Sequence, residues 1–210
     1  MPTNLSTEVT IRLKKQYPNP VTELIYSNEM QLAVAVMLSA QTTDKKVNEV
    51  TANLFKKYKS WEDFANASLP LLTDDIYGVN FHKGKAERLI AAGKTVLSMF
   101  GGQLPKTIAE LIQIPGVARK SANVILQELW DISEGIVVDT HITRVSTRLG
   151  FTKNTDPVKI ERDLMALLPK ETWRNYSAGI VLHGRYTCVA KKPKCHECIF
   201  KDICPSFDRA

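Results

Sequence analysis

Cysteine is missing from the first 187 residues of this 210-residue chain, and all four cysteines lie between residues 188 and 204. A long apolar run is missing too, since the longest, Leu32 to Leu38, is far shorter than the roughly 20 residues that cross a bilayer. The N-terminal sequence MPTNLSTEVTIRLKK lacks the apolar segment of a signal peptide. We therefore expect a cytosolic protein, whose thiols stay reduced, so that metal binding explains the cysteines better than disulfides do.

Acidic side chains are the scarcer charged group, with 22 Asp and Glu against 28 Lys and Arg. A basic excess favours a polyanionic partner, of which nucleic acid is the commonest in solution. An anionic membrane surface is the rival partner, but it needs an amphipathic anchor or a lipidation site. The sequence offers neither, and we expect no membrane partner.

Alternating β patterns are also absent, and no run of four or more residues alternates convincingly with the period of a strand. Apolar residues instead recur at spacings of three and four, which is typical of helices. We predict an all-α fold with about ten helices. The predicted helices span residues 5–17, 30–40, 45–58, 61–67, 69–77, 83–100, 107–113, 119–130, 140–149, 156–168 and 172–186.

The cysteines are spaced C-x6-C-x2-C-x5-C, so four soft ligands lie in a loop short enough to wrap around one centre. Thiolates suit zinc and iron–sulfur clusters alike. Structural zinc sites usually pair two C-x2-C units, whereas only Cys195 and Cys198 form one here. The spacing alone leaves zinc and a [4Fe-4S] cluster both open.

The stretch LIQIPGVARKSANVILQEL, residues 111–129, reads as a helix–hairpin–helix. Its short turn opens a helix whose first amides have no partner within the helix, and such amides bind a phosphate without reading sequence. A corner that merely packs is the alternative. Lys120 lies near the start of this helix. Most lysines are solvated cations, but a helix N-terminus and neighbouring Arg119 both favour the neutral amine that Schiff-base chemistry needs.

A third stretch, GIVVDTHITRVSTRLGF, spans residues 135–151. Asp139 ends a short apolar run and precedes a helix, so either Asp139 or Thr140 is a candidate N-cap. Capping does not exclude catalysis, because an aspartate held at a helix start is also a preorganised charge.

In this order, GVARKSANV, VVDTHITRV and LHGRYTC with the cysteine spacing resemble endonuclease III, the bifunctional DNA glycosylase and abasic-site lyase. The resemblance runs from SAQTTDKKVN to the last cysteine. It implies excision of oxidised pyrimidines in base excision repair, followed by β-elimination, with Lys120 as nucleophile and Asp139 as its carboxylate partner. It also implies two helical domains: a barrel over residues 22–132 with the hairpin, and a cluster domain made of residues 1–21 and 133–210.

The resemblance further implies a [4Fe-4S] cluster and a partner, double-stranded DNA that contains a damaged pyrimidine or an abasic site. We expect a monomer associated with the nucleoid. The implied cluster ligands are Cys188, Cys195, Cys198 and Cys204. The side chains implied to fill the gap left by a flipped nucleotide are Gln41 and Phe81. The other expected DNA contacts are Ile114, Gly116, Val117, Ala118, Arg119, His141, Arg144, Arg185, Lys191 and Lys194.

Three other functions fit the sequence less well. An adenine glycosylase would carry a glutamate before the Gln-Thr motif, where AVAVMLSAQT has no acid, and it would lack Lys120. A mismatch-specific thymine or uracil glycosylase also typically lacks that lysine. A non-catalytic, cluster-bearing DNA-binding protein would need neither Lys120 nor Asp139.

The chain departs from the family pattern in two places. The hairpin reads Gly116-Val117-Ala118 where the family usually has Gly-Val-Gly. If residue 118 needed a left-handed backbone, alanine there would cost about 1–2 kcal/mol. Asn80 and His82 stand where glycine and tyrosine are frequent. We expect both departures to affect DNA affinity and lesion preference rather than the chemistry.

Overall fold

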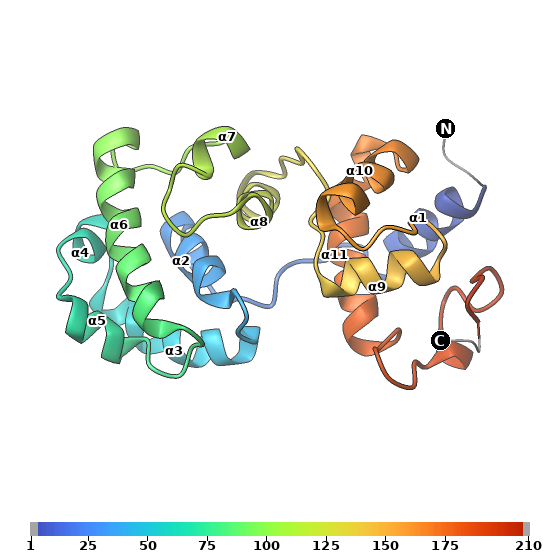
Figure 1. Cartoon of the computed structure of the whole chain (residues 1–210), viewed down its shortest axis with the longest axis horizontal. Coiled ribbons are helices and arrows are strands. Elements are labelled where there is room, and N and C mark those ends of the chain that lie inside the picture. Colours follow the sequence, from blue (N-terminus) through green and yellow to red (C-terminus); the bar gives the residue numbers. More distant parts are fainter. Residues whose placement is uncertain (1–3, 208–210) are drawn as a thin grey trace. The chain divides into compact units, whose positions relative to one another are not determined.

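The structure is a computed structural model that describes residues 4–207. Every regular element among these residues is a helix, which confirms the predicted all-α class (Figure 1). The chain divides into two compact units. One consists of Glu23–Ile132, and the other joins Met1–Thr22 to Ser133–Ala210. None of the helices in the described residues combines the length and the apolar character needed to cross a membrane.

The unit formed by Glu23–Ile132 is built around one buried helix. Every residue of that helix from Met30 to Leu38 is buried except Gln31, so it is apolar on nearly all sides, as the sequence predicts. It packs against α3, α6 and α8. The helices of this unit are α2 (Glu29–Ser39), α3 (Asp44–Lys57), α4 (Trp61–Ala65), α5 (Leu69–Asp75), α6 (His82–Phe100), α7 (Ile108–Leu111) and α8 (Arg119–Trp130).

Several helices of this unit begin at side-chain caps. Thr43 caps α3 by accepting a hydrogen bond from the amide of Lys46 at 3.3 Å. Ser60 and Asp63 form a capping box at the start of α4. Each cap satisfies an amide that has no partner inside its helix.

Three predicted helices of this unit are too long at their C-terminal ends. The predictions 61–67, 69–77 and 107–113 end in the structure at Ala65, Asp75 and Leu111. Bonds that span three residues replace the helical bonds there, for example from the amide of Tyr77 to the carbonyl of Asp74 at 3.1 Å. Such bonds tighten the last turn and end the helix, which an apolar pattern cannot reveal.

Gly93 allows α4 and α6 to lie against each other. A Cβ atom at this position would stand 2.8 Å from the backbone nitrogen of Ala65 and 2.8 Å from the carbonyl oxygen of Trp61. The close approach of the two helices therefore requires glycine at position 93, because any side chain would push backbone atoms apart.

The second unit contains α1 (Asn4–Gln16), α9 (Thr140–Arg148), α10 (Pro157–Leu167), α11 (Trp173–Tyr186) and two 3₁₀ turns, η1 (Lys170–Thr172) and η2 (Cys195–Glu197). The long α11 packs against both α1 and α9. Tyr176 of α11 is fully buried, and its hydroxyl lies 2.8 Å from that of Ser146 on α9. The first helix of the chain thus belongs to the same core as the last.

Candidate active site and cluster loop

The hairpin between α7 and α8 is anchored in the core by two apolar side chains. Ile114 and Val117 are buried, and the amide of Val117 donates to the carbonyl of Ile114 at 3.0 Å. Gly116 has a φ of +89°, and a Cβ atom there would lie 2.9 Å from the Cε of Met37. The buried side chains of Ile114 and Val117 hold the hairpin in the core, and the exposed Gly116 leaves the backbone between them accessible to a ligand.

Ala118 does not adopt the left-handed conformation considered for it. Its φ is −90° and its ψ is 167°, which is extended backbone that any residue accepts. Alanine at this position therefore carries no backbone strain. Its side chain cannot cap α8, so no side-chain oxygen occupies the N-terminus of that helix. The positive end of α8 can therefore receive an external acceptor such as a phosphate.

Lys120 is an exposed residue in the first turn of α8. It follows Arg119, the first residue of the helix. The opposite face of α8 is anchored in the core by Ala122, Ile125 and Leu126. The amine is thus carried on a fixed helix at its positive end.

Asp139 is the N-cap of α9, as one interpretation of the sequence proposed. Its Oδ1 accepts hydrogen bonds from the amides of His141 and Ile142, each at 2.8 Å. Both bonds use the same oxygen, so the second carboxylate oxygen takes no part in the cap. The cap holds the carboxylate in one orientation, which is the preorganisation that an electrostatic role in catalysis requires.

His141 and Arg144 lie on α9 and contact each other within the same unit. An Nη2 of Arg144 lies 3.2 Å from Nδ1 of His141 and donates to the carbonyl of Gly184 at 2.8 Å. Burial lowers the pKa of His141, although the charge of Asp139 acts in the opposite direction. Arg144, expected to contact DNA, thus also fastens the last turn of α11.

The four cysteines surround one cavity in the loop that follows α11. All four line it, together with Arg148, Lys194 and Lys201. The loop is folded by its own backbone: the amide of Cys188 donates to the carbonyl of His183 at 2.8 Å, and that of Lys194 to the carbonyl of Thr187 at 3.0 Å.

Two residues that the sequence analysis missed place side-chain nitrogens at the sulfur atoms. Nη1 of Arg148 donates to the Sγ of Cys188 at 3.3 Å, and Nε2 of His183 lies 3.4 Å from the Sγ of Cys198. Arg148 also donates to the carbonyl of Val189 at 2.8 Å. Arg148 follows Arg144 by one helical turn, a spacing that puts both on one face of α9. This spacing in the sequence could have indicated that Arg148 lies on the same face of the helix as Arg144.

The surroundings of the cysteines disfavour the ionised form of their thiols. Burial, followed by the charges of the other three cysteines, raises the pKa of Cys198 to about 11. Four adjacent thiolates repel one another, so a bound metal centre is needed to hold them in the ionised form. Among the described residues, no group of three or more His, Cys, Asp or Glu side chains is arranged around a single metal ion.

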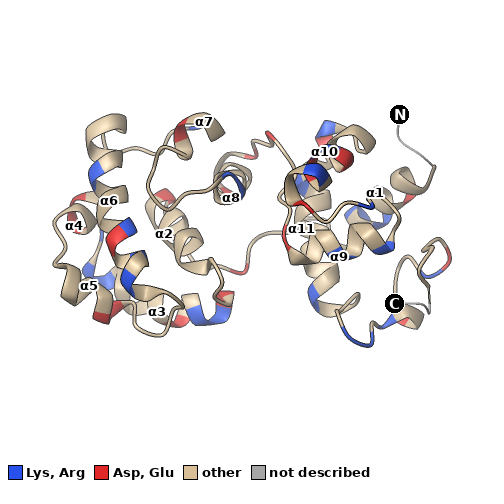
Figure 2. Ribbon diagram, viewed as in Figure 1, with Lys and Arg blue, Asp and Glu red and all other residues tan. Residues whose placement is uncertain are grey.

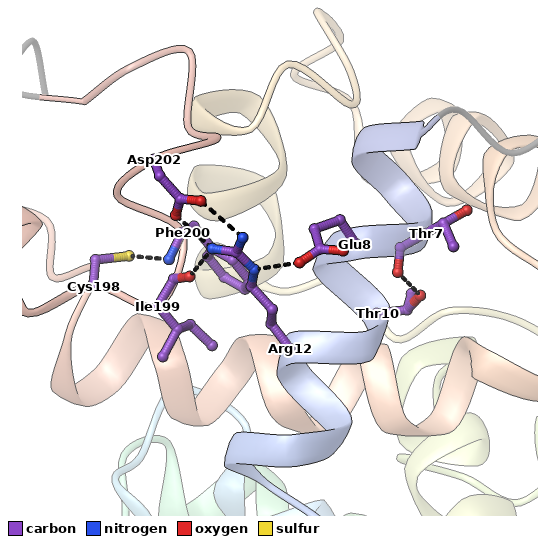
Figure 3. Close-up of polar contacts among 8 residues, drawn as sticks. All are labelled: Thr7, Glu8, Thr10, Arg12, Cys198, Ile199, Phe200 and Asp202. Atoms are coloured by element: carbon purple, nitrogen blue, oxygen red, sulfur yellow. Dashed lines mark hydrogen bonds and ion pairs between the residues drawn. The ribbon is translucent and has the colours of Figure 1, made fainter.

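A contact from the first helix of the chain holds the same loop (Figure 3). Nη1 of Arg12 donates to the carbonyl of Ile199 at 2.7 Å, and its Nη2 donates to Oδ2 of Asp202 at 2.8 Å. Glu8 orients the guanidinium by accepting from its Nε at 2.7 Å. The amide of Phe200, between these two partners, donates to the Sγ of Cys198 at 3.4 Å. Arg12 therefore acts on the segment that joins the last two cysteines.

The loop also carries an exposed group of lysines. Lys191, Lys192 and Lys194 are all exposed, and Figure 2 shows the basic stretch on the loop after α11. Arg185, at the end of α11, is half-buried. The lysines add a positive charge to a loop whose shape the cysteines determine.

Gln41 and Phe81 lie in two loops of the other unit, and both have a left-handed backbone. Gln41 has a φ of 56° and Phe81 a φ of 57°. This conformation costs about 1–2 kcal/mol in a residue with a side chain. Both side chains are exposed, Phe81 by 67%. A strained backbone that carries an exposed apolar ring marks a candidate binding element.

Comparisons with known proteins identify the family of the chain. Residues 34–170 match the family of HhH-GPD superfamily base excision DNA repair proteins, and residues 188–204 match the iron–sulfur binding domain of endonuclease III. The chain is 44% identical to endonuclease III of Synechocystis sp. over 96% of its own length and 92% of the relative's. It is 39% identical to endonuclease III of Bacillus subtilis over 92% of its own length and 88% of the relative's.

A solved structure of a trapped endonuclease III–DNA covalent intermediate is similar over the whole chain. The TM-score is 0.91 at 34% sequence identity, and the match covers 100% of this chain and 99% of the other. A thermostable thymine-DNA glycosylase has a TM-score of 0.85 over 97% of each chain at only 18% identity, which shows a shared fold alone. The chain, with its uncapped hairpin helix and its four-cysteine loop, therefore belongs to the endonuclease III family of base excision repair glycosylase–lyases and carries a [4Fe-4S] cluster.

Proposed function

We propose that this protein excises oxidised pyrimidines from duplex DNA and then cleaves the strand at the resulting abasic site by β-elimination, with Lys120 as nucleophile. The observation that carries the proposal is the position of Lys120 as an exposed amine in the first turn of an uncapped helix. The hairpin amides beside it bind a phosphate, so the same element that grips the backbone of DNA presents the nucleophile.

The reaction follows from the chemistry of an amine. The damaged nucleotide is first extruded from the helix, at a cost that a lesion lowers because it pairs or stacks poorly. The nitrogen of Lys120 then forms a bond to C1′ of the sugar while the bond from C1′ to the base breaks, and the base leaves with a proton. The sugar ring then opens: the bond from C1′ to O4′ breaks, O4′ takes a proton, and the nitrogen lone pair forms an iminium at C1′. This iminium acidifies the proton on C2′. Loss of this proton expels the 3′ phosphate and breaks the strand.

Asp139 supports the first step. Positive charge grows on the sugar as the base leaves, and a carboxylate held in place by two amides stabilises it without reorganising. The oxygen outside the cap is the one suited to face this charge and to move protons. Asp139 can therefore cap α9 and act in catalysis at once.

DNA is held by backbone and by basic side chains from both units. The hairpin from Ile114 to Arg119 contacts one phosphate. Lys191 and Lys194 on the cluster loop contact other phosphates. His141, Arg144 and Arg185 are further DNA contacts. Gln41 and Phe81 fill the space that the extruded nucleotide leaves. Cys188, Cys195, Cys198 and Cys204 hold the cluster, whose part is to order the loop that carries the lysines. The chain acts as a monomer on nucleoid DNA, and its two units are the hairpin domain and the cluster domain.

Borohydride trapping tests the nucleophile. The wild-type protein should form a covalent adduct with a duplex that contains an abasic site or an oxidised pyrimidine. Lys120→Gln removes the amine and should bind the same duplex without forming an adduct. Lys94→Gln, the same change at an exposed position of α6, is the control and should trap normally. Mapping of the adduct to another lysine, or undiminished trapping by Lys120→Gln, would refute the assignment.

A further inference from the structure

A lysine that none of the preceding steps uses lies buried at the base of the Gln41 loop. Lys85, in the first turn of α6, is only 5% exposed. Its ammonium donates to the carbonyls of Leu38 and Ala40, each at 2.7 Å, and to the hydroxyl of Thr42 at 3.2 Å. An ammonium has three hydrogens, so these three oxygens use all of them. A buried charge is tolerated only with such partners. The contact therefore fixes both the side chain of Lys85 and the segment from Leu38 to Thr42.

The two carbonyls belong to the end of α2, which terminates at Ser39. The last carbonyls of a helix have no partner within it, and they form the negative end of the helix dipole. Lys85 supplies the missing donors and the matching charge from another helix. It thereby determines how residues 40–42 leave α2, and the residue in the middle of that segment is Gln41.

Asn80 provides a second link between the two loops. Its amide donates to the hydroxyl of Thr42 at 3.1 Å, and its side-chain Nδ2 donates to the carbonyl of Gln41. Thr42 thus receives hydrogen bonds from both Lys85 and Asn80. Glycine, which is frequent at position 80 in the family, has no side chain that reaches the carbonyl of Gln41.

The hydrogen bonds of Lys85 and Asn80 hold the backbone of Gln41 and Phe81, the two residues with a left-handed conformation. Gln41 lies between two of the residues that Lys85 binds, and Phe81 follows Asn80 directly. The amide of Lys85 also donates to the carbonyl of Phe81 at 3.0 Å. A left-handed backbone in residues other than glycine persists only where the surroundings impose it. Both side chains remain exposed while their backbones are held.

We propose that Lys85 is a positioning residue that, with Asn80, locks the loops of Gln41 and Phe81 into one rigid wedge for nucleotide extrusion. The inference rests on the proposed function, in which these two side chains enter the DNA. A wedge that is ordered before binding does not have to be ordered during extrusion, so more of the binding free energy is left to unstack the damaged nucleotide. Lys85 itself contacts the loops and not the DNA.

The test is Lys85→Met, which keeps the length and the apolar stem of the side chain but removes all three donors. Lys94→Met makes the same change at an exposed position of the same helix and is the matched control. Extrusion is followed by the fluorescence of 2-aminopurine placed beside the lesion in a duplex. We expect Lys85→Met to slow the fluorescence rise about tenfold or more, since a misplacement of about 1 Å can cost about 100-fold. Lys94→Met should behave as wild type.

A dependence on pairing separates positioning from general damage to the fold. The slowing of extrusion in Lys85→Met should be smaller on a duplex in which the lesion lies opposite no base. There is no base pair to break in that duplex, so extrusion costs less free energy. A variant that is merely misfolded would be equally slow on both duplexes, and that result would overturn the proposal. Asn80→Gly leaves the core intact and should show a smaller defect of the same kind, so it carries the test if Lys85→Met fails to fold. The proposal would also be overturned if Asn80→Gly extruded the nucleotide at the wild-type rate while Lys85→Met either did the same or failed to fold.

Gln41→Ala and Phe81→Ala distinguish the failure of this inference from failure of the proposed function. If both leave extrusion unchanged, the wedge role of the two side chains is wrong. If they impair extrusion and Lys85→Met does not, only the positioning role is wrong. Adduct formation through Lys120 on an abasic duplex reports on the chemistry independently of either outcome.

Discussion

Arg12 and Asp202 lie 190 positions apart in the sequence and form a two-pronged ion pair, with each terminal nitrogen of the guanidinium bound to a different carboxylate oxygen (Figure 3). The pair lowers the pKa of Asp202 to about 2. Bidentate geometry sets this contact apart from ordinary surface ion pairs, most of which contribute little. Because Asp202 stands between Cys198 and Cys204, the first helix of the chain constrains the loop that holds the cluster.

Removal of this contact should loosen the cluster. Arg12→Gln loses the ion pair and the bond to Ile199, so we expect an iron chelator to bleach the visible absorption of the protein severalfold faster than in wild type. Asp202→Asn should have a smaller effect, because the bond from Arg12 to the Ile199 carbonyl remains. Lys14→Gln is the control on the same helix. Equal bleaching rates in all four proteins would show that the contact plays no part in retaining the cluster.

The cofactor itself is directly measurable. Purified protein should be yellow-brown and contain about four irons per chain, as expected for one cubane held by four thiolates. Cys198→Ser should reduce the yield of folded protein more than the activity of the part that folds. Stoichiometric zinc with no visible absorption in anaerobically prepared protein would contradict the assignment.

Asp139→Asn should separate base release from strand cleavage. Asparagine keeps the shape and the capping ability of the residue but loses its charge. Base release should therefore slow about 100-fold or more, in line with other electrostatic deletions. Cleavage at a preformed abasic site should suffer less than in Lys120→Gln. Equal losses in both assays would mean that the residue acts mainly through the fold of α9.

The lysines of the cluster loop should act on all duplexes alike. Lys191→Ala and Lys194→Ala should each weaken binding by a similar factor with damaged and undamaged DNA. Each should also reduce the slope of log K against log salt by about 1, as loss of a phosphate contact does. Lys153→Ala, outside the loop, provides the comparison. Unchanged slopes in both loop variants would show that the loop does not contact phosphates.

The titration of His141 should report the charge of Asp139. Burial and the nearby Arg144 and Arg185 lower the pKa of His141 below its usual 6.5, while Asp139 and the Gly184 backbone raise it. Loss of the aspartate charge in Asp139→Asn should therefore lower this pKa further, which NMR of the imidazole ring can follow. Since the folded protein binds this proton less tightly than the unfolded chain, His141 should cost stability as the pH falls below about 6.5. An upward shift of the pKa in Asp139→Asn would contradict the assigned role of its charge.

The sequence by itself determined the fold class and the approximate helices, and it predicted the residues that carry the chemistry. Apolar spacing predicted α2, α6 and α8 within a residue or so of their ends because burial of one face sets that spacing. It also marked Asp139 as a possible cap, since capping depends on residues close in the sequence. The cysteine spacing pointed to a metal centre because all four cysteines lie close together in the sequence.

Only the tertiary structure decided which distant groups meet. The backbone of Ala118 is extended rather than left-handed, and no local pattern showed this. Arg12 and Arg148, which contact the cluster loop, and Lys85, which contacts the end of α2, look like ordinary surface cations in the sequence. Their partners are mostly backbone carbonyls from other elements, and every residue carries a carbonyl. A contact to a group common to all residues leaves no trace in composition or spacing, so it becomes visible only when the chain is folded.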